Sequence, residues 1–235
     1  MMGISALYGY FAEKLEEVFH TNQTAIEEAA QVMSHAYQAG HTIFAFGSGH
    51  SALLVEEMYY RAGGLPLITP IWDFDVMIHR DPVRASALER TPGYARTVLQ
   101  AVTWNPGDVV WLISNSGRNA LVVEMARMAR EAGVQVIALT SMRHSRVVQA
   151  TDARGDKLFD LADVVLDNGG VLGDAGFLPE GADRPMAPTS TVLGAVLVHA
   201  VEVRVMERLA QAGAFPEILR SFNVDDPSQA EAPRA

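Results

Sequence analysis

The sequence predicts an α/β fold in which helices cover both faces of a parallel sheet. Short apolar segments alternate with segments of helical periodicity, and the connections between them are short. Polar turns rich in glycine or serine follow two of the apolar segments, at residues 47–50 and 114–119. Ligands of such sheets bind at the carboxyl ends of the strands, so both turns are expected at one candidate site.

Residues 1–40 are expected to form a helical extension, with helix over 5–39. Apolar residues recur there at helical intervals. Thr24 and Glu27 have the spacing of a capping box, and Gly40 stands where a helix would end.

The main domain is expected to span residues 41–213. Its predicted strands are 42–46, 66–71, 108–113, 134–139 and 163–167. Its predicted helices are 51–62, 85–102, 120–132 and 189–212. Pro92 and Gly93 are expected to kink or interrupt the second of these helices.

The remaining segments are predicted to be irregular. Residues 141–160 form a polar loop with some helix, and the glycine-rich segment 168–188 is long enough to suggest a functional loop. Residues 214–235 form a C-terminal tail, with disorder expected over 225–235 because of its Pro, Ser, Gln and Glu content.

Composition limits the classes of function. The 235 residues carry a net charge of −10, which argues against nucleic acid or an anionic membrane as the main partner. There is no cysteine, so disulfides and thiolate catalysis are excluded, and a cytoplasmic location is expected. The longest apolar run, 192–201, is too short to span a membrane, and no signal peptide is recognised.

Each polar turn has the layout of an anion site. In a strand–turn–helix unit, free backbone N–H groups and a helix N-terminus converge on one point. The hydroxyls of Ser48 and Ser51 in the first turn, and of Ser114 and Ser116 in the second, suit a phosphate group. Serine is also common in turns and caps for structural reasons, but two such turns at strand ends favour phosphate binding.

Four stretches with these turns resemble the sugar isomerase (SIS) family of phosphosugar-binding domains. They are Gly47–Ser51, Ile113–Gly117, Val136–Ser141 and Thr189–Val192. The resemblance implies a three-layer SIS domain with a five-stranded parallel sheet. It also implies a homodimer or a dimer of dimers, with active sites near the subunit interface.

Four further stretches are similar to the stand-alone SIS proteins that resemble bacterial N-acetylglucosamine-6-phosphate dehydratase. They are Glu56–Gly64, Leu88–Ala95, Ser114–Asn119 and Leu161–Asn168. The chain departs from other SIS domains at Leu121, where many have glutamate, and at Arg61, where the phosphoheptose isomerases and a related etherase have a catalytic glutamate.

The candidate site residues follow from the turns and from the resemblance. The candidate catalytic residues are Glu56, Glu57, Glu89, His79 and His199. The candidate substrate-binding residues are Ser48, Gly49, His50, Ser51, Arg90, Ser114, Asn115, Ser116, Arg118, Asn119, Thr189, Ser190 and Thr191. Alternatives remain open, since Glu57 and Arg61 could form a surface helix pair and His199 could be a packed core residue. No metal-binding spacing is found, and no cofactor is expected.

The resemblance implies a phosphosugar lyase that dehydrates N-acetylglucosamine 6-phosphate. A carboxylate would remove the C2 proton, which the C1 aldehyde acidifies, and the C3 hydroxyl would leave as water. The N-acetyl group at C2 disfavours the ketose route, because its nitrogen cannot become a carbonyl without hydrolysis. Two alternatives are an aldose–ketose isomerase similar to phosphoheptose isomerase and a sensor that binds a sugar phosphate without changing it.

Overall fold

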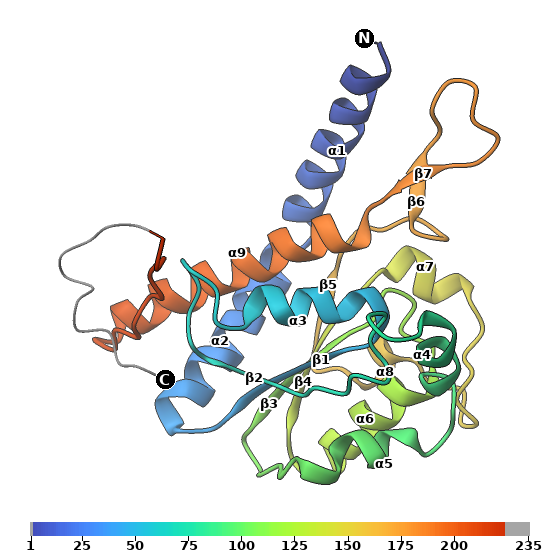
Figure 1. Cartoon of the computed structure of the whole chain (residues 1–235). Coiled ribbons are helices and arrows are strands. Elements are labelled where there is room, and N and C mark those ends of the chain that lie inside the picture. Colours follow the sequence, from blue (N-terminus) through green and yellow to red (C-terminus); the bar gives the residue numbers. More distant parts are fainter. Residues whose placement is uncertain (1, 224–235) are drawn as a thin grey trace.

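A computed structural model describes residues 2–223 of the chain. Within these residues, the main sheet has five parallel strands in the order β2-β1-β3-β4-β5 (Figure 1). The strands are β1 Ile43–Gly47, β2 Ile68–Pro70, β3 Val109–Ile113, β4 Gln135–Thr140 and β5 Val164–Asp167. The helices are α1 Met2–Thr21, α2 Gln23–Ala39, η1 Gly49–Ser51, α3 Ala52–Met58, α4 Pro82–Leu88, α5 Tyr94–Val98, η2 Leu99–Ala101, α6 Ala120–Glu131, α7 Met142–Val147, α8 Leu158–Leu161 and α9 Ser190–Gln211.

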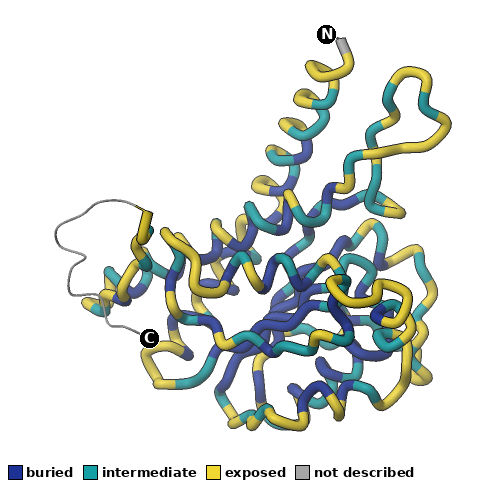
Figure 2. The backbone as a smooth tube through the Cα atoms, viewed as in Figure 1, coloured by how far each residue is buried: buried dark blue, intermediate teal, exposed yellow. Residues whose placement is uncertain are grey.

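Two apolar cores lie on opposite faces of this sheet, because successive side chains of a strand point to opposite sides. Ile43 and Ala45 of β1 join the core formed with α2, α3 and α9, whereas Phe44 and Phe46 join the core formed with α5, α6 and α8. In Figure 2 the buried residues concentrate along the sheet. The predicted three-layer fold and five-stranded parallel sheet are confirmed.

The helical N-terminal segment predicted over 5–39 is confirmed, but it forms two helices rather than one. The break is at Asn22, which is buried and binds the backbone of β5 in both directions. Its Nδ2 donates to the Asp167 carbonyl at 2.8 Å, and its Oδ1 accepts from the Asp167 N–H at 2.8 Å. A side chain thus pairs with the edge strand, and Thr24 lies inside α2 rather than at its cap. α2 packs against α9 and contributes to the core.

One predicted helix is shorter than expected, and the predicted break in another is confirmed. The helix predicted over 51–62 ends at Met58, because Tyr59 adopts extended backbone and Tyr60 has a positive φ of 47°. The helix predicted over 85–102 is interrupted around Pro92 and Gly93, as expected, and consists of α4, α5 and η2. Asp81 caps α4 by accepting from the N–H groups of Val83 and Arg84.

The glycine-rich segment 168–188 contains a two-stranded antiparallel hairpin, β6 Ala175–Phe177 and β7 Met186–Pro188. Together with α1 it projects away from the sheet (Figure 1). The carboxylate of Asp174 closes the base of the hairpin, since it accepts from the N–H of Thr189 at 3.1 Å and from the N–H and Oγ of Ser190 at 2.8 and 2.7 Å. Asp174, and not the side chain of Thr189, therefore binds the first N–H groups of α9.

The first part of the predicted C-terminal tail packs against the body. Leu219 exchanges backbone hydrogen bonds with the loop at Gly63 and Gly64, at 2.8 and 3.0 Å. The segment for which disorder was predicted, 225–235, lies outside the described residues. None of the helices within residues 2–223 has the length and apolar character required to cross a membrane.

A candidate sugar-phosphate site at the carboxyl ends of β1 and β3

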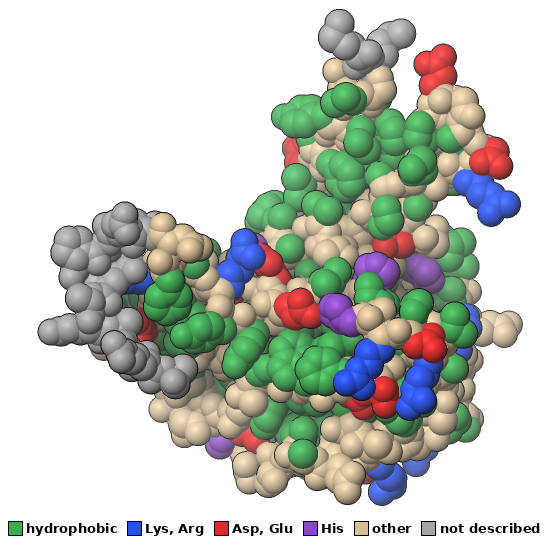
Figure 3. Space-filling view, viewed as in Figure 1, with side chains coloured by type: hydrophobic (Ala, Val, Ile, Leu, Met, Phe, Trp, Pro, Cys, Tyr) green, Lys and Arg blue, Asp and Glu red, His purple; other side chains and the backbone are tan. Residues whose placement is uncertain are grey.

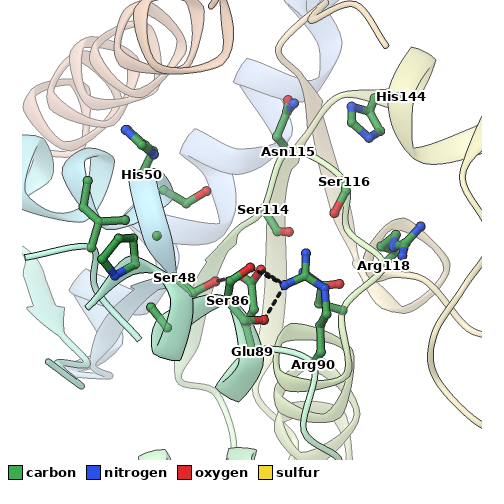
Figure 4. A pocket seen from close by; sticks show the side chains of 16 residues that line it. Ser48, His50, Ser86, Glu89, Arg90, Ser114, Asn115, Ser116, Arg118 and His144 are labelled. Carbon is green, nitrogen blue, oxygen red and sulfur yellow. Dashed lines mark hydrogen bonds and ion pairs between the residues drawn. The ribbon is translucent and has the colours of Figure 1, made fainter. Parts of the chain in front are cut away.

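A polar cavity of about 530 Å³ opens where β1 and β3 end (Figure 4). This volume lies within the range of about 300–1,000 Å³ that is usual for small-molecule sites. The lining residues are Ser48, Gly49, His50, Ser51, Ile78, Pro82, Ala85, Ser86, Glu89, Arg90, Ser114, Asn115, Ser116, Arg118, Asn119 and His144. β1 and β3 are neighbours in register, with Gly47 beside Ile113, which brings the two polar turns together.

The first turn is held by backbone contacts and by the absence of a side chain at Gly47. A Cβ there would lie 2.5 Å from the carbonyl oxygen of Ser51, so only glycine fits without a shift. The N–H of Gly49 donates to the Val76 carbonyl at 2.8 Å. The Ser48 hydroxyl donates to Glu89 Oε2 at 2.9 Å, so its proton is directed at the carboxylate. Ser51 forms no side-chain hydrogen bond within residues 2–223 and can donate to a ligand.

The second turn presents several unpaired donors to the cavity. Gly117 has a φ of 58°, and its N–H donates to the Ser114 hydroxyl oxygen at 3.2 Å, which leaves the Ser114 proton free. The backbone N–H groups of Ser116, Arg118 and Asn119 have no partner among the residues that the structure describes. They lie just before the 12-residue helix α6, whose N-terminal dipole favours an anion at this point.

Two side chains of this turn also lack internal partners. Asn119 is 8% exposed, and its Oδ1 is buried without a hydrogen-bond partner. Burying such a group costs about 1–3 kcal/mol, so a ligand donor that reaches it would bind favourably. The guanidinium of Arg118 lines the cavity and forms no ion pair within the described part of the chain. The turn therefore offers one acceptor and several donors.

Glu89 and Arg90 approach the cavity from the end of α4 (Figure 4). The Glu89 side chain is 19% exposed and pairs with Arg90 Nη1 at 3.1 Å. The same guanidinium also contacts the hydroxyl and carbonyl oxygens of Ser86. The backbone carbonyl of Glu89 accepts from the N–H of Leu121 at 3.1 Å, so Glu89 is tied directly to the first turn of α6.

The other candidate catalytic residues lie outside the cavity. Glu56 and His79 are exposed on the surface. Glu57 and His199 contact each other, with Glu57 Oε1 2.9 Å from His199 Nε2. On its other side, His199 Nδ1 lies 3.3 Å from Glu202 Oε2.

Glu202, Glu57 and His199 form a cluster outside the cavity, in which Glu202 is 8% exposed. Burial raises the pKa of Glu202; the hydrogen bond with His199 opposes this rise, and the charge of Glu57 adds to it. The Glu57–Arg61 surface pair considered from the sequence is also present, at 3.0 Å.

The three candidate residues at the start of α9 lie beside the cavity rather than in it. Ser190 and Thr191 line a small void of about 10 Å³ next to His50 and Asn115. Thr189 is fully buried, and its hydroxyl binds Asp174. Thr189 and Ser190 support the hairpin base through their contacts with Asp174.

Two polar residues of the cavity carried no signal in the sequence. Ser86 and His144 line the cavity, but each belongs to a segment without a recognisable motif. His144 enters from α7, on the side opposite Glu89 (Figure 4). Burial lowers the pKa of His144; the nearby Asp174 opposes this effect, and Arg118 adds to it.

The cavity carries an excess of positive charge although the chain is acidic. Two guanidinium groups and one carboxylate line it, which suits a dianionic phosphate. Among residues 2–223, no three His, Asp or Glu side chains are grouped in a way that could hold a metal ion. The cavity thus combines donors for a phosphate with one carboxylate that can accept a proton.

Comparison with known proteins identifies the family. A model of the SIS domain matches residues 7–141. A UPF0309 protein of Halalkalibacterium halodurans is 42% identical over 216 residues, which cover 92% of this chain and 89% of the relative. The chain is a SIS-domain protein of the UPF0309 family. A second UPF0309 protein, from Shouchella clausii, is 33% identical over 226 residues, with 96% of this chain and 92% of the relative covered.

Solved structures support the fold of this UPF0309 protein. The phosphoheptose isomerase GmhA of Neisseria gonorrhoeae superposes with a TM-score of 0.54 at 21% identity, covering 86% of this chain and 97% of that one. Identity at this level shows the shared fold alone. Membership of the SIS family implies a sugar-phosphate ligand.

Proposed function

We propose that this protein is a phosphosugar lyase that dehydrates N-acetylglucosamine 6-phosphate. The observation that supports it best is the position of Glu89, whose carboxylate lines the cavity opposite the donors of the second turn. Of the three glutamates considered from the sequence, Glu89 alone lines the cavity, so we propose it as the general base.

The phosphate group is proposed to bind at the second turn. The Ser114 and Ser116 hydroxyls, the free backbone N–H groups and the N-terminus of α6 supply donors, and Arg118 supplies charge. Hydrogen bonds to a charged group contribute about 1.5–3 kcal/mol each, so the site needs no lysine. The sugar chain would then extend across the cavity toward Glu89.

The reaction needs one proton acceptor near C2. Glu89 takes the C2 proton, the electron pair of that bond forms a double bond between C2 and C3, and the C–O bond at C3 breaks. The leaving hydroxyl takes up the proton that Glu89 now carries and departs as water, which regenerates the carboxylate. The Ser48 hydroxyl and Arg90 hold the carboxylate in place.

Incubation with N-acetylglucosamine 6-phosphate tests the proposal. The expected product is an unsaturated sugar phosphate that absorbs in the ultraviolet and is lighter by one water. Clean conversion of sedoheptulose 7-phosphate, with no loss of water from the amino sugar, would favour the isomerase. Binding of a sugar phosphate that stays unchanged for days would favour the sensor.

We also propose that two copies of the chain associate through the arm formed by α1 and the β6–β7 hairpin. Large apolar side chains are exposed on both parts, including Ile4 at 79%, Tyr8 at 75% and Leu178 at 59%. Figure 3 shows hydrophobic side chains gathered over this arm. Extended apolar surface of this kind is typical of a protein interface.

A further inference from the structure

His144 is the cavity residue whose role neither the motifs nor the proposed function explains. Its ring lies on the α7 side of the cavity, near Ser116 and across from Glu89 (Figure 4). The ring is partly buried, and Nε2 has no hydrogen-bond partner among the described residues. A donor or acceptor on a bound molecule could therefore occupy that position.

The contact at the other ring nitrogen fixes which tautomer is present. The backbone N–H of Gly173 donates to His144 Nδ1, with 3.3 Å between the nitrogen atoms. An Nδ1 that accepts a hydrogen bond carries no proton, so in the neutral imidazole the proton is on Nε2. Nε2 is therefore a donor. Burial, which lowers the pKa of His144, also favours this neutral form.

The backbone around the ring is held on both sides. The Ser141 hydroxyl donates to the Gly170 carbonyl at 2.6 Å and accepts from the N–H of His144 at 3.0 Å, so it joins the start of α7 to the loop before the hairpin. Gly173 precedes Asp174, whose carboxylate closes the hairpin base through Thr189 and Ser190. The position of the Gly173 N–H is thus set by hydrogen bonds on both sides of it along the chain, at Gly170 and at Asp174.

We propose that His144 is a substrate-binding residue that donates a hydrogen bond from Nε2 to an oxygen atom of the bound sugar phosphate. This inference rests on the proposed function of the same cavity. A neutral imidazole can orient the sugar without adding to the positive charge that Arg90 and Arg118 already bring to the cavity. The histidine contributes a directed donor and transfers no proton.

Two isosteric variants separate this role from a structural one. His144→Gln places an amide N–H near the position of Nε2, whereas His144→Asn places its amide near Nδ1 and can retain only the contact with Gly173. The dissociation constant for N-acetylglucosamine 6-phosphate, measured by calorimetry in a Glu89→Gln background that suppresses turnover, should rise less than about 10-fold in His144→Gln. It should rise about 10- to 100-fold in His144→Asn, as expected for the loss of one hydrogen bond to a ligand.

The pattern across the two variants decides the outcome. Equal losses in both variants, no loss in either, or a larger loss in His144→Gln would each overturn the proposed donor role. Thermal melting of both variants shows whether either has failed to fold. In that case the tautomer and its response to ligand in the wild-type chain decide the question.

Nitrogen-15 NMR of the imidazole in the wild-type protein reads the tautomer directly, with no variant. We expect a protonated Nε2 and an unprotonated Nδ1, and a shift of the Nε2 resonance when the sugar phosphate binds. The opposite tautomer, an Nε2 resonance that ignores the ligand, or binding of neither N-acetylglucosamine 6-phosphate nor sedoheptulose 7-phosphate would each contradict the inference. Binding of N-acetylglucosamine 6-phosphate without turnover would contradict the proposed lyase activity but not the donor role of His144.

Discussion

Glu89 is held through both its side chain and its backbone. Its side chain accepts from the Ser48 hydroxyl and pairs with Arg90, and its backbone carbonyl accepts from the Leu121 N–H. A carboxylate held by a hydroxyl from the first turn and by the adjacent guanidinium, on a backbone that is itself tied to α6, has few conformations to lose when a substrate binds. This is the arrangement expected of a positioned general base.

Replacing Glu89 with glutamine should therefore lower kcat about 100-fold or more, with little change in KM, because a general base contributes about 10²–10⁴-fold. Glutamine keeps the size and can still accept from Ser48. Glu56→Gln is the matched control, since Glu56 is exposed outside the cavity. Steady-state kinetics with N-acetylglucosamine 6-phosphate make the measurement. Near-normal turnover by Glu89→Gln would show that another residue removes the proton.

The raised pKa of Glu202 predicts how the stability of the protein depends on pH. Burial raises the pKa of its carboxyl group above the unfolded value, so the folded state binds a proton more readily than the unfolded chain does. Its contribution to stability is present below the unfolded pKa of 4.5 and is lost as the pH rises through the folded value. The melting temperature of Glu202→Gln minus that of the wild type should therefore be larger at pH 8 than at pH 5.

Calorimetric melting of both proteins at the two pH values tests this. The groups that face Glu202 are His199, Glu57 and Arg61, so a Glu57→Gln variant run in parallel shows how much of the effect comes from the neighbouring charge. A difference in melting temperature that does not change with pH would contradict the assignment.

At the scale of elements, the loop between α7 and α8 supports the second turn. Thr151 donates to the Arg118 carbonyl from both its N–H and its hydroxyl, at 3.3 and 2.8 Å. Arg127 of α6 holds the same loop through Asp152 at 2.9 Å and Asp156 at 2.8 Å. The shape of the turn thus depends on an ion-pair cluster that lies outside the cavity.

Arg127→Ala should lower the free energy of unfolding by about 1.5–3 kcal/mol, because it leaves the buried Asp152 without its charged partner. It should also raise KM, because the second turn, where the phosphate is proposed to bind, loses the support of this loop. Arg130→Ala is the matched control on the same helix, since its side chain is 47% exposed and pairs with the exposed Asp163. A surface pair of this kind contributes about 0–1 kcal/mol. Urea unfolding gives the free energy of unfolding of each variant. If both variants lose the same amount, Arg127 does not support the loop as proposed.

The strands and turns were predictable because their signals are local. Buried parallel strands appear as short apolar runs, and glycine or serine turns after them mark the strand ends. The break at Asn22 could not be predicted, since it comes from the pairing of its side chain with the backbone of Asp167, far away in sequence. The entry of His144 into the cavity depends likewise on how α7 packs. Whether the turn residues bind phosphate stays a prediction.

At the scale of the whole molecule, the apolar arm predicts the oligomeric state. Tyr8→Glu and Leu178→Glu place charges at the centre of the proposed interface and should convert a dimer to a monomer. Val83→Glu is the control, because Val83 is equally apolar and 78% exposed but lies on α4. Light scattering coupled to size-exclusion chromatography gives the mass of each variant. A wild-type chain that is monomeric at micromolar concentration would exclude the interface.

The hydrogen bond from the Leu121 N–H to the Glu89 carbonyl also has a consequence for substrate length. It connects the carboxylate segment to the first turn of α6, so the spacing between proton acceptor and phosphate site is set by one short backbone contact. Under the proposed assignment, the cavity would select sugars by the number of carbons between the reacting centre and the phosphate. Pentose 5-phosphates would place C2 short of Glu89, and heptose 7-phosphates would place it beyond. The enzyme would then discriminate by chain length as well as by the group carried at C2.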